Sequence, residues 1–166
     1  MEGLVNWLAN VFSGINENVF IFILSMLPVL ELRGGMIAAT LLNVPYVRAL
    51  IICIIGNVIP IPFILFFWRK VLIWLKKFKV TGKFANWVEN KTLKKRKQVD
   101  KYGFWGLILF TGIPLPGTGA WTGSILASLL YIPVKRSSIA ICIGVFLAAA
   151  IMSIITYLIP WLVSMI

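Results

Sequence analysis

Residues 112–123 read GIPLPGTGAWTG and lie in the middle of an apolar stretch that covers residues 103–131. Proline cannot donate the backbone hydrogen bond that continues a helix, and clustered glycines mark turns, so this segment must break any helix. Each of the two remaining apolar legs is too short to cross a bilayer, which takes about 20 helical residues. The pattern therefore favours a re-entrant helical hairpin, which enters the membrane and returns to the same side.

A second apolar stretch, residues 19–42, is broken in the same way by Pro28 and by the sequence ELRGG at residues 31–35. The alternative is a bundle with more and shorter spans, whose loops lie at a membrane face. We favour hairpins because each stretch is followed by a proline and a basic residue before a long apolar segment begins. These exit sequences are NVPYVR at residues 43–48 and YIPVKR at residues 131–136.

The composition indicates an integral membrane protein of one domain with an all-α fold. Of the 166 residues, 60% are hydrophobic and 13% are charged, and the mean hydropathy is +0.97, whereas soluble domains average about 25% charged residues. Residues 46–68 and 137–160 are long and apolar enough to be transmembrane helices. We expect Pro60 and Pro62 to kink the first of them, and Pro160 to disturb the end of the second.

The expected order of elements is a repeat of hairpin plus span. It consists of an interfacial amphipathic helix (1–17), a re-entrant hairpin (18–44), a transmembrane helix (46–68), a basic amphipathic linker (69–101), a second re-entrant hairpin (102–132) and a second transmembrane helix (137–160). A hairpin returns to its own side and a span crosses once, so the two units form an inverted repeat, as in many secondary transporters. The linker carries twelve Lys or Arg against two acidic residues, which places it in the cytoplasm. We expect Gly82 to divide this linker into two helices.

The two hinges of the hairpins carry the groups of an anion-binding site. Their return legs are expected to start around residues 34–35 and 119–120, and a helix N-terminus attracts anions through its unpaired N–H groups and positive dipole end. Irregular backbone at mid-membrane depth must be covered by protein or line a cavity, so the hinges are expected to meet there. The glycines have an equally strong explanation in tight turns and close helix packing. The candidate binding residues are Arg33, Gly34, Gly35, Thr118, Gly119, Trp121 and Thr122, and the candidate hinge residues are Pro28, Pro114, Pro116 and Gly117.

Glu31 is a candidate functional residue because a charged side chain within the membrane costs at least ~2.5–3.5 kcal/mol on insertion scales. Three interpretations of it stay open. It pairs with Arg33 as a neutral brace, or desolvation favours its protonated form and makes it a proton carrier, or it recognises a cationic substrate. Trp121 lies next to the second hinge, whereas the other tryptophans are expected to anchor helices at the membrane interface.

The sequence argues against an enzyme, a cofactor and a metal site. It contains no histidine and only five carboxylates, which excludes His-based nucleophiles and His-ligated metals. Cys53 and Cys142 lie in apolar segments and are expected to be buried hydrophobes rather than ligands. The aromatic residues of the basic linker fall on one helical face, which favours anionic membrane lipids over nucleic acid as its partner.

The motifs ELRGG (31–35) and GIPLPGTGAWTG (112–123), the latter preceded by KYG (101–103), resemble the prokaryotic small multi-drug export protein family over nearly the whole chain. Members often have proline at the position of Ile37. The paired hairpins are also similar to the DedA superfamily, whose members move lipids and carry acidic and arginine residues on their re-entrant loops. Glu31 and Arg33 match that pattern, whereas the second hinge has no charge. The resemblance implies a multi-pass protein of the prokaryotic cytoplasmic membrane.

These observations predict a transporter or flippase for a lipid-linked phosphate of the undecaprenyl phosphate kind, or for another anionic lipid. In this hypothesis Arg33 binds the phosphate, the hinge N–H groups stabilise it, and Glu31 handles a proton. One alternative is a small multidrug exporter of lipophilic cations that uses Glu31 as counter-ion. Another is a non-transporting membrane scaffold that uses the basic linker. The chain has little bulk to shield two polar hinges, so we expect a homodimer.

Overall fold

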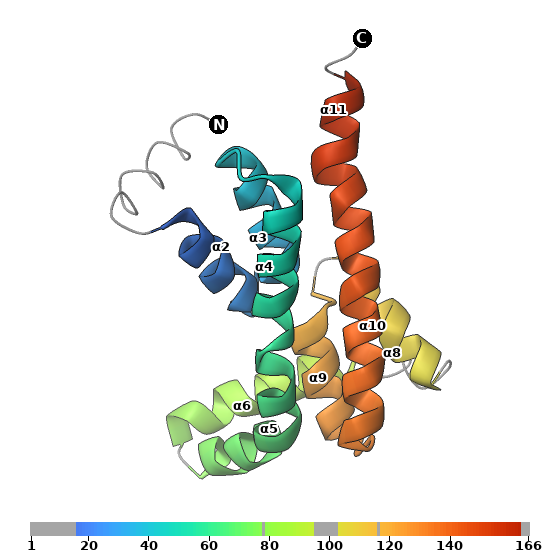
Figure 1. The fold of residues 1–166 in the computed structure, drawn as a ribbon. Helices are drawn as coiled ribbons and strands as arrows, with labels where there is room; N and C mark the ends of the chain where they lie inside the picture. The colour runs from blue at the N-terminus through green and yellow to red at the C-terminus, as the bar shows by residue number, and fades with distance from the viewer. Residues whose placement is uncertain (1–15, 78, 95–102, 116, 164–166) are drawn as a thin grey trace. The chain divides into compact units, whose positions relative to one another are not determined.

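The computed structural model describes residues 16–77, 79–94, 103–115 and 117–163, which form helices and turns (Figure 1). No strand occurs in these ranges, so the all-α prediction is confirmed. The interfacial helix expected at residues 1–17 lies almost entirely outside the described residues. Pro116 and the part of the linker at residues 95–101 lie outside them as well.

The chain forms two compact units, and two long apolar helices contribute to both. Unit 1 consists of residues 1–57 and 149–166, and unit 2 consists of residues 58–148. The helical stretches Tyr46–Trp68 and Val134–Val163 have 23 and 30 residues. Because a crossing needs about 20 apolar residues, the two predicted spans are confirmed in length and composition.

Unit 1 contains a helical hairpin and parts of both apolar helices. Its elements are α2 (Glu17–Met26), α3 (Glu31–Leu41), α4 (Tyr46–Val58) up to Asn57, the end of α10 (Val134–Ser153) from Ala149, the π-helix η1 (Ile154–Leu158) and α11 (Ile159–Val163). α2 begins after Asn16, whose side chain accepts a hydrogen bond from the N–H of Asn18 at 2.9 Å, a favourable N-cap. It ends at Met26, and its C-cap Leu27 is extended (φ −73°, ψ 139°) because Pro28 follows it. α2 and α3 pack against each other.

The end of the second apolar helix is disturbed, as predicted from Pro160. The N–H of Ile159 donates to the carbonyl oxygen of Ile154, five residues back, so η1 is π-helical. Pro160 has no N–H and cannot continue the usual bond to the fourth preceding residue, and a single π turn relieves this mismatch. α3 contacts η1, so the irregular turn packs against the hairpin. Turns of this kind frequently occur at functional sites.

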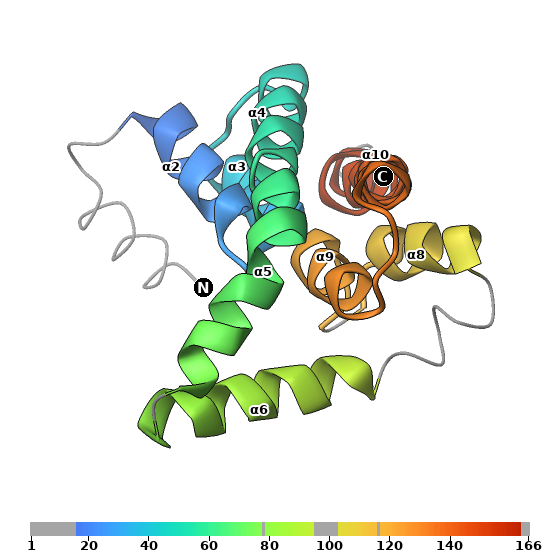
Figure 2. The same ribbon diagram turned by 90° about the horizontal axis from the view of Figure 1, so that it is seen from below.

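Unit 2 contains the second helical hairpin and the two helices that precede it. Its elements are α5 (Pro60–Lys76), α6 (Lys79–Leu93), α8 (Gly103–Gly112), α9 (Ala120–Leu129) and α10 (Val134–Ser153) up to residue 148. Of the two expected irregularities, the one at Pro60 is confirmed as an interruption, since α4 ends at Val58 and α5 has proline at its first position, where its missing N–H is harmless. Pro62 lies in the first turn of α5, which continues through it. α9 packs against α5, α6 and α8 (Figure 2).

The prediction that Gly82 divides the basic linker is wrong. α6 runs through Gly82, and the interruption lies between α5 and α6 instead. A Cβ atom at Gly82 would lie 3.3 Å from the carbonyl oxygen of Lys76, so glycine allows α6 to approach the end of α5 closely. Lys76 also forms an ion pair with Glu89, which joins the two helices.

Both return helices end in the same hydrogen-bonded turn. A residue with positive φ follows the C-cap in each case, Asn43 (56°) after α3 and Tyr131 (59°) after α9. The bonds that close the turns run from the N–H of Val44 to the carbonyl oxygen of Ala39 (2.9 Å) and from the N–H of Ile132 to that of Ala127 (3.1 Å). This is the Schellman pattern. Asn43 and Tyr131 are 88 positions apart, so the exit sequences repeat in backbone structure as well.

Candidate functional site

The first hinge is a short turn at residues 27–30, and the return helix α3 begins directly after it, at Glu31. This start lies three residues before the region of Gly34 and Gly35 that the sequence indicated. The N–H of Gly34 donates to the carbonyl oxygen of Leu30 at 2.8 Å, so it belongs to the hydrogen bonding of the helix. Pro28 ends α2, and the glycines that follow are placed inside α3.

Glu31 occupies a strained backbone position at the start of α3. Its φ is +52°, a region that non-glycine residues rarely adopt, and its side chain is only 5% exposed. A strained residue persists when the surrounding structure holds it in place, and such residues gather at functional sites. Gly119, 88 positions later, also has a positive φ (135°). A carboxylate thus stands in unit 1 where unit 2 has glycine.

Arg33 is the second charged group of this turn. Its side chain is half-buried, and the negative charge of Glu31 acts on its guanidinium. Arg33 stands two residues after Glu31, in the first turn of the same helix. The first turn of α3 therefore presents a buried acid and a half-buried base.

In the second hinge, the described residues 113–115 and 117–119 form backbone hydrogen bonds with one another and one hydroxyl bonds within the loop. The Oγ1 of Thr118 lies 2.8 Å from the carbonyl oxygen of Leu115 and 3.0 Å from that of Ile113, so it donates into the loop itself. Gly117 (φ 74°) and Gly119 (φ 135°) both have positive φ, which glycine adopts without strain. These contacts help to fix the loop, whose described residues are all uncharged.

The second return helix begins at Ala120, as predicted. Its N-cap is Gly119, which has no side chain to cap the helix, and the N–H of Gly123 donates to the Gly119 carbonyl oxygen at 2.8 Å. Trp121 and Thr122 in the first turn are half-buried, as is Pro114 in the loop. The candidate binding residues thus form two groups, one in each unit, and their meeting near the midplane stays a prediction.

A packing feature that the sequence analysis missed lies behind the first hinge. Ser25 on α2 is fully buried between two glycines, one on each neighbouring helix. A Cβ atom built on Gly35 would lie 2.0 Å from the Oγ of Ser25, and one built on Gly56 would lie 2.9 Å from the carbonyl oxygen of Phe22 and 3.0 Å from the Cβ of Ser25. We call Ser25, Gly35 and Gly56 the unit 1 clamp. It holds α2, α3 and α4 at distances that only glycine permits.

Unit 2 contains the same arrangement, formed by Thr111, Gly123 and Gly144, which we call the unit 2 clamp. A Cβ on Gly123 would lie 2.8 Å from the Oγ1 of Thr111, and one on Gly144 would lie 2.6 Å from its Cβ and 2.9 Å from the carbonyl oxygen of Ile108. Both glycines are 88 positions from their counterparts in unit 1, and Thr111 is 86 positions from Ser25. The glycine pairs at this fixed spacing are the signal that could have found the clamps.

Two buried polar atoms lie close to these features without a hydrogen-bond partner among the described residues, the Oγ1 of Thr111 and the Oδ1 of Asn57. Thr111 is 1% exposed and Asn57 is 2% exposed. The counterpart of Thr111 differs, because the hydroxyl of Ser25 donates to the carbonyl oxygen of Ile21 at 2.8 Å. Burying an unpaired polar group costs free energy, so both atoms are candidates for polar contacts that the sequence reading overlooked.

The sequence matches a family model described as "Putative small multi-drug export protein" over residues 31–151. The match begins at Glu31 and includes Arg33, the second hinge and both exit turns. No curated protein and no solved structure matches the chain. Within the part of the chain that the structure describes, no group of three or more His, Cys, Asp or Glu residues is arranged to hold a metal ion.

Proposed function

Because the chain belongs to the small multi-drug export protein family, we propose that it is a membrane transporter whose cargo is a lipid-linked phosphate of the undecaprenyl phosphate kind. The family description concerns export, which implies transport rather than catalysis. The two long apolar helices indicate a membrane protein. Arg33 and the helix N-termini at the hinges support an anionic cargo, and the long apolar helices support a cargo that resides in the membrane.

In this proposal the two helical hairpins are re-entrant and the two units form an inverted repeat. α2, α3, α8 and α9 have 10 or 11 residues each, which is about 15 Å of helix and half of a hydrocarbon layer of about 30 Å. The shared exit turns and clamps support the idea of two copies of one unit. One span after each hairpin gives the copies opposite orientations, with the basic linker in the cytoplasm.

The observation that carries the proposal is the position of Arg33 in the first turn of α3. A guanidinium binds phosphate through two parallel hydrogen bonds, and the N-terminal end of the helix adds its positive dipole. Glu31 is buried in the same turn and acts electrostatically on Arg33. A bound phosphate would compete with the Glu31 carboxylate for the guanidinium. The carboxylate would then favour its protonated form, so that binding of the cargo is coupled to uptake of a proton. The hydrocarbon tail of the cargo stays in the lipid while the phosphate passes the hinges.

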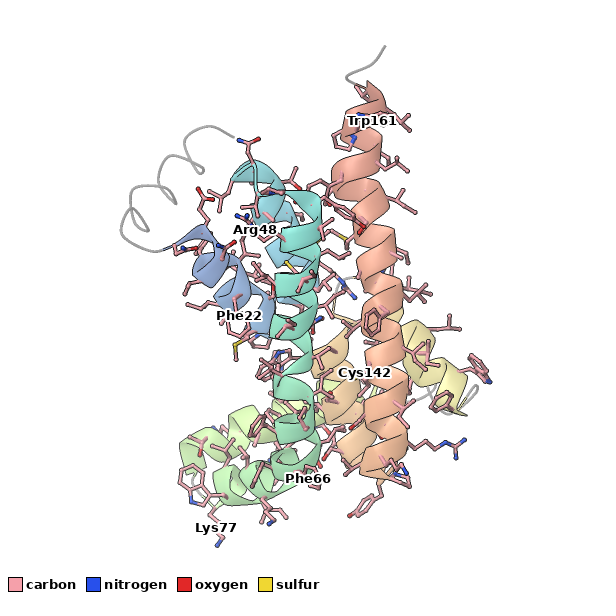
Figure 3. The ribbon with its side chains drawn as sticks, in the orientation of Figure 1. Phe22, Arg48, Phe66, Lys77, Cys142 and Trp161 are labelled. Atoms are coloured by element: carbon pink, nitrogen blue, oxygen red, sulfur yellow. The ribbon has the colours of Figure 1, made fainter. Side chains whose placement is uncertain are left out.

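The test is the flipping of a fluorescent polyprenyl phosphate across liposomes that contain the purified protein. Arg33→Ala is expected to lower the initial rate at least about ten-fold, because the charge-assisted bonds to phosphate are lost. Arg33→Lys is expected to retain part of the rate, since it keeps the charge without the planar fork. Arg48→Ala is the matched control, because Arg48 is an exposed arginine in the first turn of α4 (Figure 3). A wild-type rate in Arg33→Ala would refute the phosphate role.

The proton role of Glu31 has its own test. In Glu31→Gln, flipping is expected to continue without acceleration by a pH gradient, because the amide cannot carry the proton. The alternative function, export of lipophilic cations, makes the opposite prediction. There, Glu31→Gln abolishes transport of a cation such as tetraphenylphosphonium, and Arg33→Ala leaves it intact.

A further inference from the structure

Unit 1 carries an open groove of about 510 Å³ beside the π-helix. Its walls come from the start of α4, the end of α10, η1 and α11. The residues that line it are Tyr46, Ser153, Ile154, Tyr157, Leu158 and Trp161, and Figure 3 shows Trp161 near the end of the chain. The volume falls within the range of small-molecule binding sites. None of these residues belongs to the hinges.

The hydroxyl groups of the groove donate their hydrogens to the protein itself. Tyr46 donates to the Oγ of Ser153 at 3.1 Å, Ser153 donates to the carbonyl oxygen of Ala149 at 2.7 Å, and Tyr157 donates to the carbonyl oxygen of Val44 at 3.2 Å. The two tyrosine rings also meet edge to face, with centroids 5.1 Å apart. None of the lining residues that the structure describes is charged. The groove therefore matches an uncharged hydrocarbon chain, because its described walls are apolar side chains and hydroxyl groups whose hydrogens are already donated to the protein.

The groove lies beside the C-terminal end of α3, since its Tyr157 donates to the carbonyl oxygen of Val44 in the exit turn. η1 contacts α3, the helix whose first turn carries Arg33, and all of these residues belong to unit 1. We propose that the groove binds the polyprenyl tail of the lipid-linked phosphate whose head group Arg33 holds. This inference rests on the proposed function. The hydrogen bonds of Tyr46 and Tyr157 hold their rings in place before binding, which lowers the entropy lost when the tail enters.

The corresponding position in unit 2 differs in chemistry. Val134 stands 88 positions after Tyr46 and offers no aromatic ring. The nearby cavity of about 290 Å³ includes Arg136, whose guanidinium lies 5.8 Å from the centroid of the Phe104 ring. A cation at a cavity wall disfavours a plain hydrocarbon chain. Among the described residues, the tail groove is thus a feature of unit 1.

The test measures the binding of two phosphates to the full-length protein in nanodiscs. One is a long-chain polyprenyl phosphate, and the other is a phosphate with a single isoprene unit, too short to reach the groove. Leu158→Trp fills the groove, and Ile155→Trp is its matched control, because both side chains are 46% exposed on η1 and Ile155 does not line the groove. We expect Leu158→Trp to raise the Kd of the long-chain ligand about ten-fold, with the short-chain Kd unchanged. Ile155→Trp should change neither value.

The outcomes separate the groove from the phosphate site. If Leu158→Trp binds the long-chain phosphate with the wild-type Kd, the proposal that the groove binds the tail is refuted. This holds even if Arg33→Ala weakens the binding of both phosphates and so supports the proposed function. If Arg33→Ala changes neither Kd, the phosphate role fails, and an effect of Leu158→Trp on the long chain alone still supports the groove. Equal competition by phosphatidylglycerol would show that any acyl chain occupies it and would overturn the assignment to the cargo. If neither phosphate binds to the wild-type protein, both inferences fail.

Discussion

Units 1 and 2 share their packing and differ in their polar chemistry. Each holds its hairpin against the following span by a hydroxyl side chain between two glycines, and each ends its return helix with a Schellman turn. At the start of the return helix, however, unit 1 has the strained and buried Glu31, whereas unit 2 has Gly119. Where three helices pack so closely that only glycine fits, few substitutions are tolerated. The first residue of a helix accepts a wider range of side chains. The start of the return helix is thus charged in unit 1 and neutral in unit 2.

The largest expected effect comes from closing the clamps. Gly35→Ala would place a methyl group 2.0 Å from the Oγ of Ser25 and 2.8 Å from the Sγ of Cys53, and overpacking of this kind costs about 1–3 kcal/mol. Gly123→Ala meets the Oγ1 of Thr111 at 2.8 Å, so it is expected to cost less. The measurement is the free energy of unfolding in mixed micelles.

A second substitution shows whether the clash is the cause. Adding Ser25→Ala to Gly35→Ala removes the Oγ atom and is expected to recover part of the stability, as a non-additive pair. If Gly35→Ala is as stable as the wild-type protein, α3 and α4 are not held at glycine distance from α2. The comparison between the units would then lose its structural basis.

The next effect concerns the position where the units differ. Glu31→Gly copies the residue of unit 2 and removes the strain of a positive φ, which is worth about 1 kcal/mol. We expect a higher free energy of unfolding together with a loss of proton-coupled flipping. Glu31→Gln keeps the strained backbone and loses the charge, so it controls for the carboxylate. A lower free energy of unfolding for Glu31→Gly than for Glu31→Gln would show that the positive φ at this position does not destabilise the protein.

Most of the fold could be predicted from the sequence because its signals act locally. The length of the apolar segments identified the two long helices. The prolines at positions 28, 60 and 160 each lie at a place where a helix ends, begins or becomes irregular. The GTGA segment likewise indicated that the second return helix starts at Ala120. These signals depend on the residues of the segment itself and not on contacts with distant parts of the chain.

Glycines were harder to interpret, because their role depends on what packs against them. Gly34, Gly35 and Gly82 were read as breaks, yet all three lie inside helices. The sequence does not show that Ser25 presses on Gly35 or that the Lys76 carbonyl oxygen faces Gly82, since these contacts form between separate helices. The groove beside η1 was not predicted for the same reason, because it is formed by Tyr46 together with residues more than 100 positions later in the chain.

The smallest effect separates the two hydroxyl residues of the clamps. Ser25→Ala removes a hydrogen bond to the carbonyl oxygen of Ile21 and is expected to cost about 1 kcal/mol. Thr111→Val removes a buried hydroxyl that has no partner among the described residues and keeps the shape of the side chain, so its free energy of unfolding should stay within about 0.5 kcal/mol of the wild type or rise. Both values come from the same unfolding experiment. A cost of Thr111→Val equal to that of Ser25→Ala would mean that the Thr111 hydroxyl is bonded in the membrane, by water or by a bound molecule. Unit 2 would then contain a polar contact of its own, and the contrast between a polar unit 1 and a neutral unit 2 would no longer hold.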